Sequence, residues 1–320
     1  MSMKRAFISG ISGQSGSYLA ELLVKEGYEV HGLVRMTSLL ENIKGILDKV
    51  KLHTGDLRYQ GSLDRALSEA KPDEIYHLAS DQIVSASWDR PVEMADVTGL
   101  GTTRLLQAAH TYCPNAKFYH VSSSEIFGRV DASSQNEQSK FNPINPYACA
   151  KSYAHLIARN FRESYGMFVC IGIHFGIESP RRRMEFVTRK ISDGVAKIYL
   201  GKAQKLILGN LESIRDWTFA GDHCLAMHLI MQQNEPEDYI VARGEPHSVK
   251  DFVELAFGVV GLDWKEYVEV DPSLKRPVDV NYLCGDSTKL TKKLGWKSET
   301  SFEELVRMMV EADLGRVRHG

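Results

Sequence analysis

The chain has 320 residues, of which 43% are hydrophobic and 25% charged, as in an ordinary soluble globular protein. A formal net charge of −2 argues against a nucleic-acid-binding protein, because no basic excess is available to neutralise phosphates. The five cysteines are scattered and form no Cys-x-x-Cys pair, so we expect a reduced, cytoplasmic chain without a disulfide frame or a metal site. No signal peptide or apolar membrane-spanning run follows the N-terminus, so we expect no membrane association.

The first 175 residues alternate between short apolar runs and segments with helical periodicity. The pattern predicts strands at residues 6–9, 29–34, 50–53, 74–79, 117–122 and 168–175. It predicts helices at residues 18–24, 62–69, 97–109 and 147–165. Such alternation predicts an α/β fold with a doubly wound parallel sheet.

The pattern changes after Phe175. An arginine-rich segment at 177–183 is followed by a helix expected at 186–196 and a loop or short strand at 209–216. Further helices are expected at 249–260 and 302–314. We therefore expect a nucleotide-binding domain at residues 1–175, which also carries the catalytic residues. A smaller mixed α/β substrate lobe at 176–320 follows, with some segments returning to the first domain.

A glycine-rich loop lies between the first strand and the first helix. Gly10, Gly13 and Gly16 recur at three-residue spacing, with Gln14 and Ser15 between the last two. Glycines allow a tight turn and a close backbone approach, and the helix N-terminus adds partial positive charge for a pyrophosphate. The strand before the loop and the helix after it favour a dinucleotide-binding (Rossmann) loop over a plain turn.

The choice of cofactor is expected to depend on the end of the second strand. Folds that prefer NAD usually place an acidic residue there, whereas this chain has Arg35 followed by hydroxyl residues. A cation suits a 2′-phosphate, so we predict NADP rather than NAD, although Arg35 stacking on adenine is an alternative. We expect Asp56 and Leu57 at the adenine edge, and Leu78 and Ala79 near the cofactor ribose.

The catalytic prediction rests on residues 121–151. Tyr147 and Lys151 are four residues apart on a predicted helix and so share one face, where the ammonium is expected to lower the pKa of the phenol. An upstream hydroxyl, Ser123, is placed to share a substrate oxygen with that phenol. This set can move a proton off an alcohol while a hydride leaves the same carbon. Glu125 adds a second acid or base that simple alcohol oxidation does not need.

Alone, the Tyr-x-x-x-Lys spacing is a weak signal. The same spacing arises in an amphipathic helix with a buried tyrosine and a solvated lysine. Its position downstream of the glycine loop favours the catalytic interpretation.

Together these segments resemble the extended short-chain dehydrogenase/reductase family, and within it the GDP-mannose 4,6-dehydratases. The resemblance covers nearly the whole chain, and the arginine-rich and Phe-Val-Thr-Arg-Lys runs are its most specific parts. It rests on residues 10–34, 122–125, 146–151, 178–182, 186–190, 209–211, 215–217, 235–239, 276–277, 294–296 and 311–313.

The resemblance implies an internal redox cycle on a GDP-hexose, GDP-mannose or a close relative, that yields a 4-keto-6-deoxy sugar. It implies that Tyr147, as a phenolate, takes the proton of the sugar 4-hydroxyl. It also implies that Lys151 binds both this phenolate and the ribose of the nicotinamide. Ser123 is expected to bind the 4-oxygen. Glu125 is expected to remove the proton of carbon 5 as water leaves carbon 6.

The resemblance also implies a set of substrate-binding residues. These are Asp81, Gln82, Ser124, Gly176, Glu178, Val187, Lys190, Gly209, Arg215 and Arg276. A diphosphate needs cations, and the candidates are Arg181, Arg182, Arg189, Lys190, Arg215 and Arg276, of which about half are expected to touch ligand.

Several positions depart from the family pattern. Asp81 stands where the family usually has glutamine, and Gly176 replaces an asparagine that often binds substrate. We expect Gly176 to open space and Asp81 to add a charge near the hexose, so a related GDP-hexose or a GDP-heptose is a candidate substrate. Met36 replaces an arginine of a loop associated with tetramers, so we expect a homodimer through the two helices of the catalytic region, with a tetramer as the alternative.

Three other functions remain open at this point. An NADPH-dependent reductase of a GDP-4-keto-6-deoxy hexose shares the fold, Tyr147 and Lys151 but does not need Glu125. A sugar-nucleotide epimerase is the second. A non-catalytic NADP-binding regulatory protein is the third, and the intact Ser123, Tyr147 and Lys151 argue against it.

Overall fold

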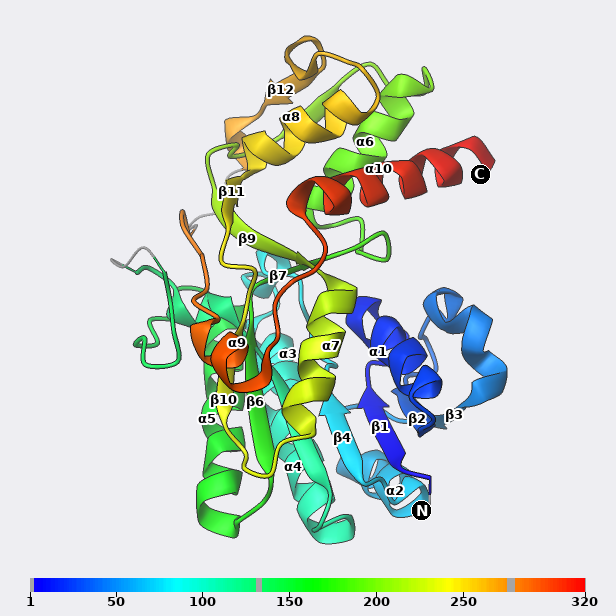
Figure 1. Ribbon diagram of the computed structural model, residues 1–320, viewed down its shortest axis with the longest axis vertical. Helices are drawn as coiled ribbons and strands as arrows, with labels where there is room; N and C mark the ends of the chain where they lie inside the picture. Colours follow the sequence, from blue (N-terminus) through cyan, green and yellow to red (C-terminus); the bar gives the residue numbers. More distant parts are fainter. Residues whose placement is uncertain (1–2, 131–133, 275–279, 320) are drawn as a thin grey trace.

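We describe residues 3–130, 134–274 and 280–319 of a computed structural model. A seven-stranded parallel sheet forms its centre, in the order β10-β6-β5-β4-β1-β2-β3 (Figure 1). Its strands are β1 (Arg5–Ser9), β2 (Glu29–Val34), β3 (Val50–Thr54), β4 (Glu74–His77), β5 (Lys117–Ser123), β6 (Val169–His174) and β10 (Asp238–Val241). Every residue of β4 and β6 is buried, as expected where helices cover both faces of a parallel sheet.

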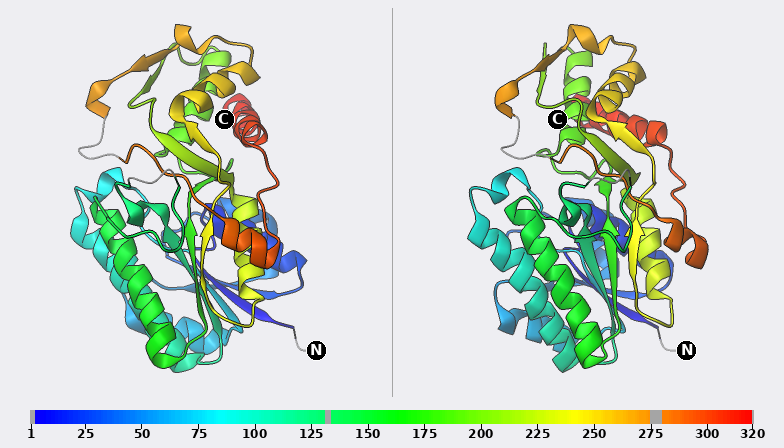
Figure 2. Two further views of the ribbon diagram at one scale, coloured as in Figure 1. Left: turned by 60° about the vertical axis from the view of Figure 1, so that its left-hand side comes forward. Right: turned by 90° about the vertical axis from the view of Figure 1, so that its left-hand side faces the viewer.

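Helices cover the two faces of this sheet (Figures 1 and 2). On one face lie α2 (Gln60–Ala70), α4 (Gly101–Tyr112) and α5 (Pro146–Tyr165). On the other lie α1 (Gln14–Lys25), α7 (Ala220–Met231) and the 3₁₀ segment η1 (Glu41–Lys49). Each face of the sheet has its own hydrophobic core. Successive side chains of β5 point to opposite faces, so Phe118 packs in one core and Tyr119 in the other. The predicted doubly wound sheet is confirmed.

A smaller mixed unit lies beyond the carboxyl ends of the central strands (Figure 1). It contains a three-stranded sheet, β7 (Gly176–Glu178), β9 (Ile214–Phe219) and β11 (Pro246–Ser248), and a strand pair, β8 (Leu206–Leu208) and β12 (Val268–Val270). Its long helices are α6 (Val187–Tyr199), α8 (Val249–Val259) and α10 (Phe302–His319). Aromatic packing fills its core, where Trp217 meets Phe252 edge-on and Phe302 face to face.

The remaining short elements connect these two parts. They are α3 (Pro91–Met94), α9 (Thr288–Leu294), η2 (Ser85–Ser87), η3 (Ala95–Leu100), η4 (Ser124–Phe127), η5 (Trp264–Glu266) and η6 (Pro272–Leu274). Residue 175 is not a clean boundary, because α7, β10 and α9 all come later in the chain and pack with the central sheet.

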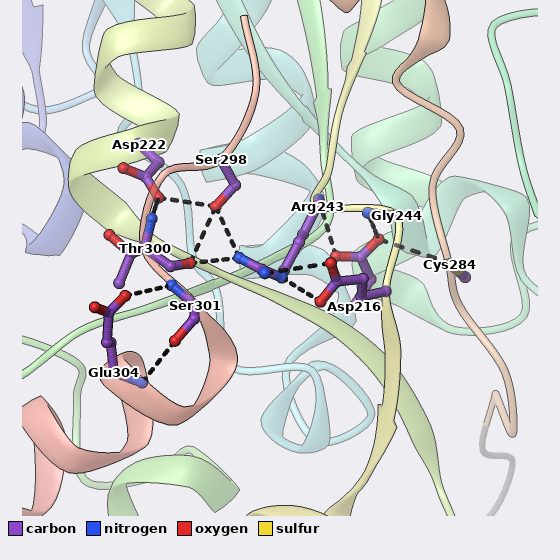
Figure 3. Close-up of polar contacts among 10 residues, drawn as sticks. Asp216, Asp222, Arg243, Gly244, Cys284, Ser298, Thr300, Ser301 and Glu304 are labelled. Atoms are coloured by element: carbon purple, nitrogen blue, oxygen red, sulfur yellow. Dashed lines mark hydrogen bonds and ion pairs between the residues drawn. The ribbon is translucent and has the colours of Figure 1, made fainter.

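A buried polar network ties the crossings between the two parts together (Figure 3). The carboxylate of Asp216, on β9, accepts the backbone N–H groups of Arg243, Gly244 and Gly285 at 3.0, 2.8 and 3.2 Å. Arg243 in turn donates to the carbonyl oxygen of Thr300, at the start of the C-terminal helix segment. Strand β9 is thereby fixed to three segments that are far apart in sequence.

Several histidines are buried against the central sheet. Burial lowers the pKa of His77 and of His223 to about 3, and it lowers the pKa of His120 and His174 well below the ordinary value. Neither ring nitrogen of His120 has a hydrogen-bond partner among the described residues. These imidazoles are therefore neutral in the folded protein at neutral pH.

We expect acid to destabilise the fold through these histidines. The unfolded chain binds their protons near pH 6.5, but the folded chain binds the proton of His77 only near pH 3 and that of His120 well below pH 6.5. Their contribution to stability is therefore complete above pH 6.5 and is lost as pH falls. Each histidine contributes a slope of up to about 1.4 kcal/mol per pH unit in that window. Urea unfolding at pH 7, 6 and 5 measures it. His120→Leu should flatten the pH dependence, whereas the control His110→Gln, at an exposed position, should leave it unchanged.

Candidate active site

The glycine loop after β1 is shaped by close backbone packing. Gly10 has a φ of +76°, a conformation that favours glycine. A Cβ on Gly16 would lie 2.1 Å from the carbonyl oxygen of Gly10, so helix α1 can approach the strand this closely only with glycine there. Gly13 caps α1 without a side-chain hydrogen bond, and the first turn holds no acidic residue. The N-terminus of α1 is therefore suited to a pyrophosphate, which fits a dinucleotide.

Gln14, which we predicted at the cofactor, also fastens the loop to the second part. Its amide nitrogen donates to the carbonyl oxygen of Ile177 at 3.0 Å, and its amide oxygen accepts the hydroxyl of Ser179 at 2.8 Å. The carbonyl oxygen of Ser15 accepts a hydrogen bond from the thiol of Cys224. The nucleotide loop and the entry to the substrate lobe are thus held at a fixed separation.

The edge of the sheet at which we predicted the adenine carries two arginines. Arg35 is exposed at the end of β2, close enough to Asp56 for its charge to lower the pKa of that carboxyl. The main cause of that lowered pKa is Arg58, whose guanidinium donates to both carboxylate oxygens of Asp56 at 3.0 and 2.7 Å. The acid that we predicted at this edge is therefore already neutralised by a partner. Leu57 is buried beside it.

Leu78 and Ala79 follow β4 directly across from the glycine loop. The backbone N–H groups of both residues donate to the hydroxyl of Ser9 on β1, at 3.1 and 3.2 Å. A Cβ on Gly10 would contact Ala79 at 3.1 Å. The two predicted cofactor segments meet between β1 and β4, where the direction of winding of the sheet reverses and such folds bind ligands.

Four predicted catalytic residues come from the end of β5 and the start of α5. The Ser123 hydroxyl and the Glu125 carboxylate both lie close enough to Tyr147 to act on the pKa of its phenol, the first lowering it and the second raising it. Helix α5 begins here because Asn145 caps it and Pro146 suits its first position, and it ends at Gly166 in the left-handed conformation. The structure brings Ser123, Glu125 and Tyr147 together at the carboxyl edge of the sheet.

The predicted lowering of the Tyr147 pKa is wrong for the protein as described. Burial raises the pKa of Tyr147 to about 12 and outweighs the effects that lower it. Those effects come from the nearby Ser123 hydroxyl and from the charge of Arg182. The ammonium of Lys151 instead donates to the carbonyl oxygen of Val121 at 2.8 Å, and burial lowers its own pKa to about 8.

Arg182 was predicted to bind a diphosphate, but it lies on the catalytic side of the site. Its guanidinium stacks over the ring of Phe186 at 3.4 Å and pairs with Glu178 at 3.2 Å. The hydroxyl of Thr188 donates to the same carboxylate oxygen of Glu178 at 2.6 Å. Glu178, predicted to bind substrate, therefore holds Arg182 in place.

The sugar side of the site shows one contradicted expectation. We expected Gly176 to open space, but a Cβ there would lie 2.6 Å from the Trp217 ring and 2.8 Å from the carbonyl oxygen of Asp216. Glycine at this position is required by the packing of β7 against β9. Asp81 does place a negative charge near the Tyr147 phenol, as its effect on the phenol pKa shows.

The other predicted substrate residues lie around the same edge. Gln82 is exposed in the segment after β4, and Ser124 is buried at the start of η4. Val187 and Lys190 occupy the first turn of α6, and Gly209 follows β8. Arg215 lies on β9, next to Asp216. Arg276 lies outside the described residues.

Two of the proposed phosphate cations are bound within the protein. Arg181 contacts helix α1, where it pairs with Glu21 at 2.7 Å and stacks over Tyr18. Arg189 pairs with Asp313 of α10 at 2.7 Å. These pairs join helices, so Arg181 and Arg189 are explained without a ligand.

Asn145 is the site residue that the sequence analysis passed over. An asparagine in front of a proline and a helical run is a typical helix start, and this signal could have identified it. Its side chain accepts the N–H of Ala148 at 2.8 Å and donates to Glu125 at 3.1 Å. It thereby links the two predicted proton-transfer residues.

The loop after β1 and the Tyr-x-x-x-Lys helix after β5 define a short-chain dehydrogenase/reductase of the extended type. The family model for GDP-mannose 4,6 dehydratase matches residues 7–309, and the chain belongs to this family. GDP-mannose 4,6 dehydratase 1 of Arabidopsis thaliana is 45% identical over 97% of this chain and 90% of its own length. The Homo sapiens GDP-mannose 4,6 dehydratase is 45% identical over 98% of this chain and 92% of its own.

A solved structure supports the fold. The UDP-glucose 4-epimerase of Thermus thermophilus, in complex with NAD, superposes with a TM-score of 0.86 at 27% identity, over 97% of this chain and 99% of that one. Within the part of the chain that the structure describes, no helix has both the length and the apolar character needed to cross a membrane.

Proposed function

We propose that the protein is a nucleotide-sugar 4,6-dehydratase that converts GDP-mannose, or a close relative, to its 4-keto-6-deoxy form. The relatives named GDP-mannose 4,6 dehydratase support the substrate class. The observation that carries the proposal is the carboxylate of Glu125, fixed by Asn145 beside the phenol of Tyr147. A reductase has no use for a second base at this place.

The chain's residues divide the proton transfers between them. Tyr147 takes the proton of the sugar 4-hydroxyl, and the Ser123 hydroxyl holds the same oxygen. A bound nicotinamide dinucleotide would supply the hydride chemistry, accepting a hydride from carbon 4 and returning one to carbon 6. Arg182 supports the negative charge that develops on the phenol, since it already acts on the phenol in the free protein.

The second stage depends on Glu125. A ketone at carbon 4 makes the hydrogen on carbon 5 acidic, so a nearby carboxylate can remove it as a proton. The bond between carbon 6 and its oxygen then breaks, and that oxygen leaves as water. A hydride at carbon 6 and a proton at carbon 5 complete the product. The sugar loses one water and the cofactor ends in its starting state.

Incubation with a panel of nucleotide sugars tests this function. Loss of one water from a GDP-hexose without added NADPH is the expected result. Gain of two hydrogens with stoichiometric NADPH oxidation identifies a reductase instead, and an isomer of unchanged mass identifies an epimerase. Protein that binds cofactor but converts none of the sugars contradicts catalysis altogether.

The sugar preference follows from Asp81. Its carboxylate lies near the catalytic phenol and pairs only loosely with Arg90, at 3.5 Å. An acceptor at this place suits a sugar with an additional hydroxyl donor, so a GDP-heptose or another GDP-hexose belongs in the panel. Best turnover with GDP-mannose itself would rule out this refinement.

A nicotinamide dinucleotide fits the site, and we propose NADP as the preferred form. Arg35 is an exposed cation at the end of β2, and the nearby Asp56 is already neutralised by Arg58. A 2′-phosphate bound here would lie near Arg35 and Arg58, and the negative charge of Asp56 would not repel it because Arg58 already neutralises that charge.

Arg35→Ala should therefore weaken NADP binding by about 10- to 100-fold, the range for a lost charge-assisted hydrogen bond, with NAD binding almost unchanged. Calorimetric titration of both cofactors measures the two affinities. Lys44→Ala, at an exposed position in η1, is the matched control. Parent protein that binds NAD at least as tightly as NADP would contradict the proposal.

We also propose a homodimer formed through α4 and α5. Apolar side chains remain exposed on and beside these helices, namely Val92, Leu100, Tyr153 and Leu156. Burying them against a second copy removes an apolar surface from water. Light scattering should give twice the chain mass, and Leu156→Glu should give the monomer. A tetramer would instead involve the loop with exposed Met36 and Leu39.

A further inference from the structure

Asn145 makes two side-chain contacts in different directions although it is buried. Its Oδ1 accepts the N–H of Ala148 at 2.8 Å, which caps helix α5. Its Nδ2 donates to Oε2 of Glu125 at 3.1 Å. The residue is only 4% exposed, so both contacts are shielded from water. One planar amide therefore binds both the helix that carries Tyr147 and, on its other side, the carboxylate of Glu125.

The chemistry of the amide fixes its orientation. A backbone N–H can only be met by the amide oxygen, and a carboxylate only by the amide nitrogen. Turning the amide over would place oxygen against oxygen at Glu125 and nitrogen against nitrogen at Ala148. The amide cannot rotate without losing both contacts, so it holds the carboxylate at a defined place relative to the first turn of α5.

The backbone around Glu125 supports the same arrangement independently. The N–H of Asn142 donates to the carbonyl oxygen of Ile126 at 2.9 Å, and its side chain donates to the carbonyl oxygen of Arg129 at 3.0 Å. Gly128 has a φ of +56°, and a Cβ there would lie 1.7 Å from the carbonyl oxygen of Asn142. The turn after Glu125 and the segment leading to Asn145 form one packed unit.

The amide leaves one oxygen of the carboxylate available. Among the residues that the structure describes, none donates a hydrogen bond to Oε1 of Glu125, while Oε2 is held by Asn145. The bound oxygen orients the group, and the other oxygen is left to accept a proton.

We propose that Asn145 is a positioning residue that fixes Glu125 for proton removal at carbon 5 by anchoring it to the N-terminus of the helix that bears Tyr147. This inference rests on the proposed function and adds a residue to it. It couples the two proton-transfer groups through one side chain, so that a change at Asn145 affects elimination more than alcohol oxidation.

Two variants separate this role from helix capping. Serine and aspartate both cap helices well, so Asn145→Ser and Asn145→Asp keep the contact with Ala148. Serine removes the amide donor, and aspartate replaces it with a like charge beside Glu125. The carboxyl resonance of Glu125 should shift in both variants, because the hydrogen bond from Nδ2 is lost in each. Nuclear magnetic resonance of carboxyl-labelled glutamate, assigned with Glu125→Gln, measures this without turnover.

Kinetics supply the second measurement. Water loss should slow by about 10- to 100-fold in Asn145→Ser, the scale expected when a reacting group is displaced by about 1 Å. Rapid formation of reduced cofactor on mixing should persist in this variant. Asn160→Ser, near the far end of the same helix, is the matched control.

Unchanged Glu125 carboxyl resonances and elimination rates in both variants would overturn the assignment. A parent protein that dehydrates no nucleotide sugar would refute the proposed function instead. The carboxyl resonance would still report whether Asn145 holds Glu125, so the two failures are distinguishable.

Discussion

Glu125→Gln is expected to stop water loss while leaving the first oxidation in place. Glutamine keeps the shape of glutamate and its amide oxygen can still accept the Nδ2 hydrogen of Asn145, but it cannot take a proton. Loss of a general base costs about 10²- to 10⁴-fold in rate. Stopped-flow absorbance of reduced nicotinamide should rise on mixing with the GDP-sugar and then stay high, because the 4-ketone accumulates.

Isotope exchange gives an independent measure of the same step. In deuterated water the parent enzyme should place deuterium at carbon 5 of the product, whereas the variant should leave the hydrogen of the recovered sugar in place. Glu163→Gln makes the same change at an exposed position on α5 and should behave as the parent. Dehydration at the parent rate in Glu125→Gln would show that another group removes the proton.

Tyr147→Phe is expected to abolish both stages. The phenol hydroxyl is the group that exchanges a proton with the sugar 4-oxygen, and phenylalanine fills the same buried space without it. A fall in kcat of about 10²- to 10⁴-fold is the expected scale. In contrast to Glu125→Gln, neither transient cofactor reduction nor deuterium exchange should appear, because no ketone forms.

Cofactor affinity distinguishes this result from misfolding. Tyr147→Phe should bind the dinucleotide as the parent does, because the glycine loop lies on β1 and α1 rather than on α5. Tyr165→Phe changes an exposed tyrosine at the other end of α5 and serves as the control. Retained transient reduction of the cofactor in Tyr147→Phe would mean that a different acid or base serves the 4-hydroxyl.

Most of the fold could be predicted from local patterns. The strand at 29–34 has the predicted bounds, and the central sheet was predicted from the alternation of apolar runs and helices. The return of β10 to that sheet could not be located, because its four residues pair with β6 only through the tertiary fold. The glycine at 176 was misread for the same reason, since Trp217 and Asp216 fill the space beside it only once β9 is in place.

The candidate site was predictable where chemistry is local in sequence. Tyr147 and Lys151 share a helix, and Ser123 and Glu125 share a turn, so their spacing pointed to them once the glycine loop upstream was recognised. The pKa of Tyr147 was not predictable, because it depends on burial by segments from the rest of the chain. The contribution of Arg182 likewise depends on a stack with Phe186 and a pair with Glu178 that spacing does not reveal.

The placement of β10 and α7 has a consequence for how this chain can be divided. A fragment ending at residue 175 would leave one edge of β6 unpaired and the α7 side of the sheet uncovered. Such a fragment would expose apolar surface and associate with itself rather than bind nucleotide alone. Domain swaps with related enzymes would therefore have to exchange α7, β10 and α9 together with the first 175 residues, so the smaller mixed unit cannot be transplanted as one continuous stretch.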